Sequence, residues 1–530
     1  MGNQRECGVL LPISSLPSKY GIGCFSKSAY EFVDQLKAAG QGCWQILPLG
    51  PTSYGDSPYQ SFSTFAGNPY FISLEDLIEE GVLTEKECDA VDFGSREDDV
   101  DYEKIYKGRY KLLRKAYERS DISKNPDFVR FQQEQAHWLG DYALFMAVKD
   151  RFEGIPWTEW AEDIRLRWNN ALDYYRKELY FEIEFQEYMQ FKFYEQWAKL
   201  KAYANRRGIR IIGDIPIYVA MDSADTWANP GLFKLDENNE PTQVAGCPPD
   251  GFSADGQLWG NPLFRWDEMK KDNYTWWTKR IKAMSELYDI IRIDHFRGFD
   301  SYYAIPAKDK TAKNGKWKQG PGMDLFNQLE KKLGKLPIIV EDLGFLTDSV
   351  RKLLKDSGFP GMKVIQFAFD SREGSDYLPH TYTSHCVVYT GTHDNDTVMG
   401  WMKTAPKASV KFAIEYLNLT EEEGYNWGMM RAAWSSVADM AIVPMQDLIG
   451  LGSEARINIP STLGENWKWR ALEGQITKDL AKKLYKYMQM YGRINEKVLA
   501  EQAKKAAEKE AAEKEAAKKK TSDKKKSSEK

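Results

Sequence analysis

Arg292, Asp294 and His295 stand together where an apolar run of the chain ends. Residues 288–297 read Tyr-Asp-Ile-Ile-Arg-Ile-Asp-His-Phe-Arg, and the β-branched residues at 290–293 favour a strand buried on both faces. Side chains alternate along a strand, so Arg292 and Asp294 lie on the same side. Burying such a pair costs free energy unless polar groups meet it. The stretch is therefore either a structural ion pair that caps the strand or one corner of a functional site.

Other apolar runs of the chain also end in acidic residues. The residues at these ends are Asp214, Glu341, Asp342, Asp394 and Asp396, with His393 directly before the last two. If the runs are parallel strands of one barrel, their carboxyl ends meet at one mouth. Like charges gathered there repel, so at least one carboxyl should hold its proton to a higher pH than usual. A protonated carboxylic acid beside an ionised one is what glycoside cleavage requires.

A metal site is the main alternative chemistry for the same residues. Asp294, His295, His393 and Asp394 are residue types that ligate divalent ions. The chain has only five histidines, however, and they are scattered. We therefore expect neither a metal nor a cofactor, and we expect His295 and His393 to donate hydrogen bonds to substrate hydroxyls.

Eight short apolar runs predict the strands that must position these residues. They lie at 8–13, 43–47, 209–215, 290–293, 337–340, 364–369, 386–389 and 442–446. Helix-like stretches separate most of them, and the clearest are 28–39, 266–286, 322–333 and 349–356. Alternating strand and helix signals imply parallel strands with crossover helices. Eight such units predict an α/β fold, the closed (β/α)8 TIM barrel.

Two long stretches interrupt this regular spacing. Residues 74–205 have helical periodicity and high charge, and they predict a helical insertion subdomain between the second and third strands. Residues 218–261 are rich in Pro, Gly and Asp, and they predict an ordered loop over the site. We expect one catalytic domain over residues 1–495 that includes both insertions. Residues 496–530 form an Ala-, Lys- and Glu-rich tail that predicts a solvated helix fading into disorder.

Composition limits the class of partner. The 530 residues carry a net charge of −5, which implies no broad attraction to nucleic acid. The sequence has neither a signal-peptide core nor a run of about 18 uncharged apolar residues, so we expect no membrane span. The six cysteines are scattered without a C-x-x-C pair, which argues against a zinc site and a disulfide framework. These features predict a cytoplasmic protein.

The motifs, taken in order, resemble those of the 4-α-glucanotransferases of glycoside hydrolase family 77, also called amylomaltases or disproportionating enzymes. The resemblance runs from about residue 8 to residue 491. Besides the strand ends above, it is carried by LPISSLP at 11–17, YGIG at 20–23, WQILPLGP at 44–51, YGDSPYQS at 54–61, GDIP at 213–216, AGCPPDGF at 245–252, WGNP at 259–262, RINIP at 456–460 and GENWKWR at 464–470. Ser461 departs from the pattern, because we expect glycine after Pro460 in the family.

The resemblance implies roles for particular residues. Asp294 would be the nucleophile that forms a covalent glycosyl-enzyme, Glu341 the general acid and base, and Asp394 the carboxylate that favours the distorted sugar ring. Arg292 would keep Asp294 ionised and oriented. Tyr59, Asp214 and His393 would contact the sugar on the donor side, Trp259 would offer a stacking face, and the loop 248–255 would lie over the acceptor region. The expected substrate-binding residues are Arg292, His393, Asp214, Tyr59, Ser57, Trp259, Pro249, Asp250, His295 and Asn395.

The activity so implied moves a segment of an α-1,4-glucan to the 4-OH of glucose or of another maltooligosaccharide. The expected substrates are maltooligosaccharides and glucans derived from starch or glycogen, and the protein would be a monomer or a weak homo-oligomer. A hydrolase, or a branching or debranching relative on the same barrel, is an alternative because hydrolysis needs the same carboxylates. A non-catalytic glucan-binding protein is a third interpretation, against which the complete set of three carboxylates speaks.

Overall fold

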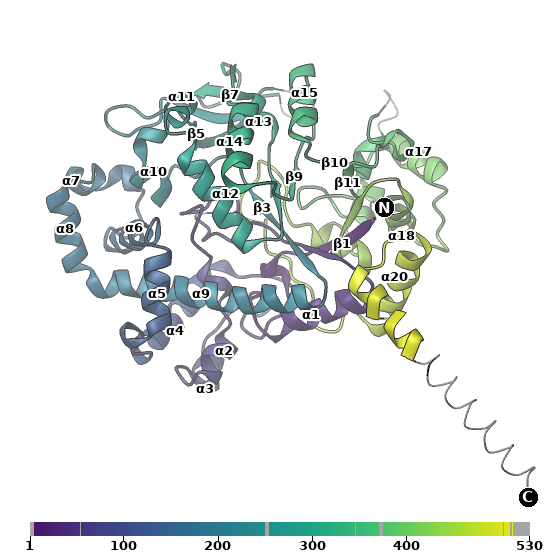
Figure 1. Ribbon diagram of the computed structural model, residues 1–530, viewed down its shortest axis with the longest axis horizontal. Helices are drawn as coiled ribbons and strands as arrows, with labels where there is room; N and C mark the ends of the chain where they lie inside the picture. Colours follow the sequence, from purple (N-terminus) through teal and green to yellow (C-terminus); the bar gives the residue numbers. More distant parts are fainter. Residues whose placement is uncertain are drawn as a thin grey trace, which may run out of the picture.

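The core of the protein is a barrel of eight parallel strands (Figure 1). A computed structural model describes residues 5–53, 55–249, 254–344, 346–369, 375–501, 503–508 and 511. The strand order is β10-β11-β12-β1-β2-β3-β6-β9. The strands are β1 (Glu6–Leu10), β2 (Cys43–Gln45), β3 (Arg210–Ile215), β6 (Ile290–Ile293), β9 (Ile338–Val340), β10 (Gly361–Val364), β11 (Cys386–Tyr389) and β12 (Met440–Pro444). The Val340 N–H donates to the Pro360 carbonyl at 3.1 Å and draws the two edge strands together. The predicted (β/α)8 barrel is confirmed.

Three of the eight strands lie earlier than predicted, and the first of them, β1, spans Glu6–Leu10 and not residues 8–13. β10 ends at Val364, and residues 365–369 of the predicted strand form a 3-10 helix instead. β12 ends at Pro444, and helix α19 (Met445–Ile449) takes up the rest of that prediction. Ile365, Ala368 and Phe369 are all buried. The apolar run therefore continues past the strand into a buried turn, and hydrophobicity alone cannot mark where the strand ends.

Crossover helices cover the outside of the barrel. They are α1 (Lys27–Ala38), α11 (Trp266–Lys271), α12 (Thr275–Leu287), α13 (Arg297–Asp300), α14 (Met323–Leu333), α15 (Asp348–Ser357), α16 (Val398–Thr404), α17 (Lys407–Leu417), α18 (Tyr425–Ser435) and α20 (Lys478–Met490). The single helix predicted at 266–286 is two helices, α11 and α12. Asn273 and Tyr274 adopt the left-handed conformation between them, with φ of 57° and 56°. Right-handed helix cannot continue through that backbone.

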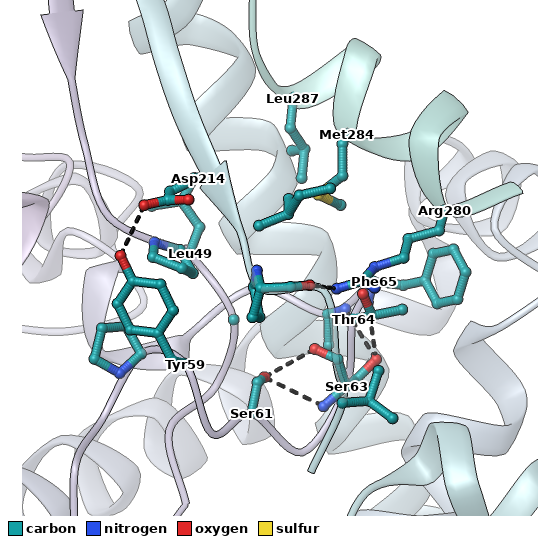
Figure 2. A pocket seen from close by; sticks show the side chains of 18 of the residues that line it. Leu49, Tyr59, Ser61, Ser63, Thr64, Phe65, Asp214, Arg280, Met284 and Leu287 are labelled. Carbon is teal, nitrogen blue, oxygen red and sulfur yellow. Dashed lines mark hydrogen bonds between the residues drawn. The ribbon is translucent and has the colours of Figure 1, made fainter. Parts of the chain in front are cut away.

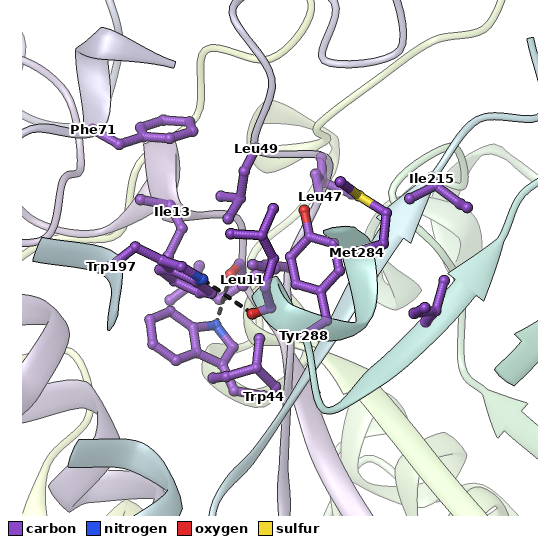
Figure 3. Packing of buried hydrophobic residues seen from close by; sticks show 14 of the residues in the cluster. Leu11, Ile13, Trp44, Leu47, Leu49, Phe71, Trp197, Ile215, Met284 and Tyr288 are labelled. Carbon is purple, nitrogen blue, oxygen red and sulfur yellow. Dashed lines mark hydrogen bonds between the residues drawn. The ribbon is translucent and has the colours of Figure 1, made fainter. Parts of the chain in front are cut away.

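A helical insertion follows β2 and lies on one side of the barrel, in the blue part of Figure 1. Its helices are α2 (Leu74–Glu79), α3 (Glu85–Asp89), α4 (Tyr102–Arg119), α5 (Pro126–Glu134), α6 (Leu139–Arg151), α7 (Glu162–Arg165), α8 (Asn169–Glu178) and α9 (Tyr180–Arg206). Trp197 of α9 is buried in the same hydrophobic cluster as Trp44 of β2 (Figure 3). Its indole N–H donates to the Leu287 carbonyl at 3.0 Å. The insertion and the barrel therefore share one core.

The structure also contains a second, antiparallel sheet, and two of its four strands lie in the stretch for which the sequence predicted only a loop. Its strand order is β5-β4-β7-β8. The strands are β4 (Gln243–Cys247), β5 (Gln257–Pro262), β7 (Ser301–Pro306) and β8 (Lys316–Gln319), and helix α10 (Ala224–Ala228) precedes them. The expected loop at 218–261 thus contains a helix and two strands, which its Pro and Gly content hides. Only Asp294, His295, Phe296 and the short helix α13 lie between β6 and β7, so this sheet is attached next to Asp294. In the described part of the chain, no helix is both long and apolar enough to cross a membrane.

Candidate active site

Arg292 is the side chain on which the strand ends converge. It is buried in β6, and its guanidinium faces three partners. Nη1 lies 2.5 Å from Asp214 Oδ2, Nη2 lies 3.0 Å from Asp294 Oδ1, and Nε donates to Met362 Sδ at 3.4 Å. Asp214 is the register partner of Arg292 on the neighbouring strand β3. The ion pair that alternation predicted between Arg292 and Asp294 is therefore present, and a second carboxylate supports it from behind.

Asp214 holds the Arg292 guanidinium in place from the interior of the barrel. Its side chain has no exposed surface, and Oδ2 also accepts a hydrogen bond of 2.7 Å from the Tyr59 hydroxyl (Figure 2). The resemblance implied that Asp214 contacts the sugar, but in this structure the buried Asp214 side chain is not accessible to a sugar. A cavity of about 40 Å³ lies behind Asp214 and Tyr59 and reaches Arg280. Such a space holds water but no sugar, and it does not include the three carboxylates.

Asp294 and Glu341 follow the neighbouring strands β6 and β9. The Glu341 carboxyl is fixed at both oxygens, because the His295 N–H donates to Oε2 at 2.9 Å and the Leu343 N–H donates to Oε1 at 2.6 Å. His295 has a φ of 54°, which is uncommon for a residue with a side chain. The residue after Asp294 thus takes a strained backbone conformation and binds the Glu341 carboxyl.

The two carboxyls ionise at different pH. Burial, together with the charge of Asp294, raises the pKa of Glu341 to about 8. Burial also raises the pKa of Asp294, but there the Arg292 guanidinium works in the opposite direction. Asp294 therefore loses its proton first. The result is an ionised carboxylate beside a protonated carboxylic acid at neutral pH, as the gathered acidic residues predicted.

Asp394 lies in the loop after β11 with its side chain 47% exposed. Oδ1 accepts a hydrogen bond from Asn458 Nδ2 at 2.6 Å and lies 3.4 Å from His393 Nε2. The Asp394 carbonyl accepts from Arg456 Nη2 at 2.6 Å. Asn458 and Arg456 were not among the predicted site residues. Their alternate spacing in Arg-Ile-Asn-Ile-Pro, which puts both on one side of an extended chain, is the signal that could have found them.

Aromatic rings surround the carboxylates. Tyr59 stacks on His393 with the ring centroids 5.1 Å apart. Trp467, which the sequence did not single out, packs against these two rings at 5.9 and 6.0 Å. Trp259 of β5 meets the ring of His295 edge to face at 4.8 Å. Burial lowers the pKa of His295 to about 4, so its imidazole is neutral at neutral pH. Flat, uncharged faces of this kind suit the apolar faces of sugars.

The remaining predicted residues lie in different places. Ser57 Oγ accepts from the Tyr59 N–H at 3.3 Å. Asn395 Oδ1 accepts from the N–H and the hydroxyl of Thr392, so this oxygen holds its own loop together. Pro249 is exposed, and Asp250 lies outside the described residues. Within the residues that the structure describes, no group of three or more His, Cys, Asp or Glu side chains is placed to hold a metal ion.

Comparisons with known proteins agree on the relatives of the chain. The sequence profile of the 4-alpha-glucanotransferases, glycoside hydrolase family 77, matches residues 11–475. The chain is 53% identical over 483 residues to a 4-alpha-glucanotransferase of Clostridium butyricum, covering 91% of this chain and 99% of that protein. It is 50% identical over 499 residues to one of Streptococcus pneumoniae, covering 94% and 99%. Among solved structures, an amylomaltase from Streptococcus agalactiae in complex with acarbose has a TM-score of 0.90 at 41% identity, covering 93% of this chain and all of that one. The resemblance seen in the motifs is confirmed.

Proposed function

The chain belongs to the 4-alpha-glucanotransferases of glycoside hydrolase family 77 and is a glycosyltransferase acting on α-1,4-glucans, and from this premise we propose how its own residues perform the transfer. In the first step, ionised Asp294 attacks the anomeric carbon while Glu341 gives its proton to the departing glycosidic oxygen. A covalent glycosyl-enzyme forms. In the second step, Glu341 takes the proton of the acceptor 4-OH, and that oxygen displaces Asp294. Two inversions leave the α-configuration unchanged.

The observation that carries this assignment is the unequal environment of the two carboxyls. Asp294 is paired with Arg292 at 3.0 Å, which favours its charged form. Within the described residues, the Glu341 carboxyl is bonded by two backbone N–H donors and forms no ion pair. Burial and the charge of Asp294 outweigh the effect of Arg292 and raise the pKa of Glu341 to about 8. The nucleophile must be ionised and the acid protonated in the same step, so the roles follow from the ionisation.

The aromatic groups support a division into donor and acceptor sides. Tyr59, His393 and Trp467 form one packed group beside Asp394, and we assign them to the donor sugar. Trp259, on β5 and against His295, is assigned to the acceptor side. A ring held there would keep a sugar hydroxyl in line with the intermediate and exclude water, which favours transfer over hydrolysis. The substrates we propose are maltooligosaccharides and starch- or glycogen-derived glucans, with glucose among the acceptors. Because the similar amylomaltase structure contains acarbose, acarbose should bind here too.

Incubation with maltotriose alone tests the activity. We expect glucose together with oligomers longer than the substrate, whereas shortening alone would indicate hydrolysis. Activity should survive a chelator, since we propose no metal. Asp294→Asn should abolish transfer, and a fluorinated maltosyl fluoride should label the peptide that contains Asp294. A label on another residue would contradict the assignment of the nucleophile.

We further propose that the protein works in the cytoplasm as a monomer or weak homo-oligomer. No disulfide joins its six cysteines in the described chain, and five of them are buried, which supports a reducing compartment. Sedimentation of the purified protein over a range of concentrations tests the oligomeric state.

A further inference from the structure

One segment of the chain holds Asp394 and the residue before it. It comprises residues 456–458, directly after the 3-10 turn Ser453–Ala455. Arg456 Nη2 donates to the Asp394 carbonyl at 2.6 Å. The Asn458 N–H donates to the His393 carbonyl at 3.1 Å, and Asn458 Nδ2 donates to Asp394 Oδ1 at 2.6 Å. Two backbone groups and one side-chain oxygen of the loop after β11 are thus fixed by a segment more than sixty residues later in the chain.

The two side-chain oxygens of Asp394 therefore have different surroundings. Oδ1 is held by Asn458 and lies near His393 Nε2. Within the described residues, Oδ2 accepts no hydrogen bond, and the side chain as a whole is 47% exposed. One oxygen is anchored and the other is open to a ligand hydroxyl.

Asn458 is itself held firmly. Its carbonyl accepts a hydrogen bond of 2.8 Å from Arg456 Nε. The neighbouring Ile457 is buried in the core, and its carbonyl accepts from the Trp467 N–H at 2.7 Å. The backbone that carries the Asn458 side-chain amide is thus fixed to both the hydrophobic core and the aromatic group. The amide can therefore hold the Asp394 side chain in one orientation.

A neutral amide fits the electrostatics of this place. Asp394 lies close enough to Asp294 for the two negative charges to repel. The Asn458 amide bonds Oδ1 and adds no positive charge. An added positive charge would oppose the oxocarbenium-like sugar. We propose that Asn458 is a positioning residue for the transfer: it holds Asp394 in one orientation, so that the open oxygen meets the hydroxyls of the distorted donor sugar. This inference rests on the proposed transferase function and on the role that the family resemblance implies for Asp394, the carboxylate that favours the distorted sugar ring.

The test compares Asn458→Ala with Thr462→Ala. Thr462 lies in the same part of the chain, and its hydroxyl donates to the Ile459 carbonyl, with no contact to Asp394. For Asn458→Ala we expect kcat for maltotriose transfer to fall roughly tenfold to a hundredfold, the range for losing a hydrogen bond to a charged group. Asn458→Asp should lower kcat further, because it replaces the amide donor with a second negative charge beside Asp394. Thr462→Ala should leave kcat unchanged.

A double-mutant cycle on acarbose affinity isolates the pair. If Asn458 acts through Asp394, Asn458→Ala should weaken acarbose binding in the native background and have little further effect in Asp394→Asn. Equal effects in both backgrounds would overturn the inference and leave Asn458 a structural residue. If Asp394→Asn alone leaves transfer and acarbose affinity unchanged, the proposed role of Asp394 fails, which the cycle distinguishes from failure of Asn458.

Discussion

At the scale of single residues, the role proposed for Glu341 predicts an upper pH limit for the reaction. The pKa of Glu341 is about 8 in the folded protein, and the general acid must be protonated when the leaving oxygen departs. We therefore expect kcat/KM for maltotriose to fall as the pH rises through about 8. Glu341→Gln should remove this limb and most of the activity, while a maltosyl fluoride, whose leaving group needs no proton, should restore the first step. An unaltered alkaline limb in that variant would assign the limb to another group.

The buried pair of Asp214 and Arg292 makes a second prediction at this scale. Both side chains are at most 3% exposed, so removing the charge of Asp214 leaves buried Arg292 with the partly exposed Asp294 as its remaining ion-pair partner. Asp214→Asn should lower the free energy of unfolding by about 3–5 kcal/mol. It should also lower kcat/KM, because Arg292 is then free to turn away from Asp294. Tyr59→Phe, which removes only the hydroxyl bonded to Asp214, should cost about 1 kcal/mol. Denaturant unfolding measures both, and equal losses would contradict the charge argument.

At the scale of elements, the apolar runs located the eight strands of the barrel, but they marked neither where every strand ends nor how the strands meet. Alternation placed Arg292 and Asp294 on one side of β6. It could not reveal that Asp214 is the register partner of Arg292, because register depends on contacts between segments far apart in the sequence. For the same reason Asn458, which contacts Asp394 across the fold, carried no role in the sequence. The strands β4 and β5 were missed because Gly and Pro weaken a strand signal.

Close approach between β3 and the end of α12 gives an element-scale prediction. A Cβ on Gly213 would lie 2.1–2.2 Å from the ring of buried Tyr288. Gly213→Ala should therefore displace β3 and lower the free energy of unfolding by about 1–3 kcal/mol. Transfer should fall as well, because Asp214 follows directly. Gly231→Ala is the matched control, since a Cβ there meets nothing within 4 Å. If both variants unfold at the same denaturant concentration, the contact is not tight in solution.

At the scale of the whole molecule, the additions to the barrel share one attachment side. The helical insertion, the β4–β5 pair and the β7–β8 pair all lie in connections that leave the carboxyl ends of β2, β3 and β6. In a (β/α)8 barrel this is the end where catalytic residues stand. The sequence located the helical insertion through its periodicity. The sequence did not predict that the insertion and the barrel share a core, in which Trp197 packs in the same cluster as Trp44. Periodicity indicates which face of a helix is apolar, but not which element covers that face.

The segment after α20 returns to the barrel before the chain ends. Residues 496–501 are helical, and Val498 is 7% exposed. Lys497 Nζ donates to the Asn205 carbonyl at 2.6 Å, in the last turn of α9. Glu501 pairs with Lys37 at 2.8 Å. The start of the predicted tail therefore contributes a buried side chain and a cation at a helix C-terminus, both of which stabilise the fold.

Two truncations separate this contribution from catalysis. Removing residues 496–530 should lower the midpoint of thermal unfolding by roughly 2–3 °C. The shift is small because the unfolding entropy of so long a chain is large, so a loss of a few kcal/mol in the free energy of unfolding changes the midpoint little. Transfer from maltotriose below that midpoint should be unchanged, since Lys497, Val498 and Glu501 contact the barrel away from the three carboxylates. Removing only residues 509–530 should change neither property. Loss of transfer in the longer truncation would show that the tail takes part in the chemistry. Equal shifts of the unfolding midpoint in the two truncations would show that residues 509–530, and not residues 496–508, stabilise the fold.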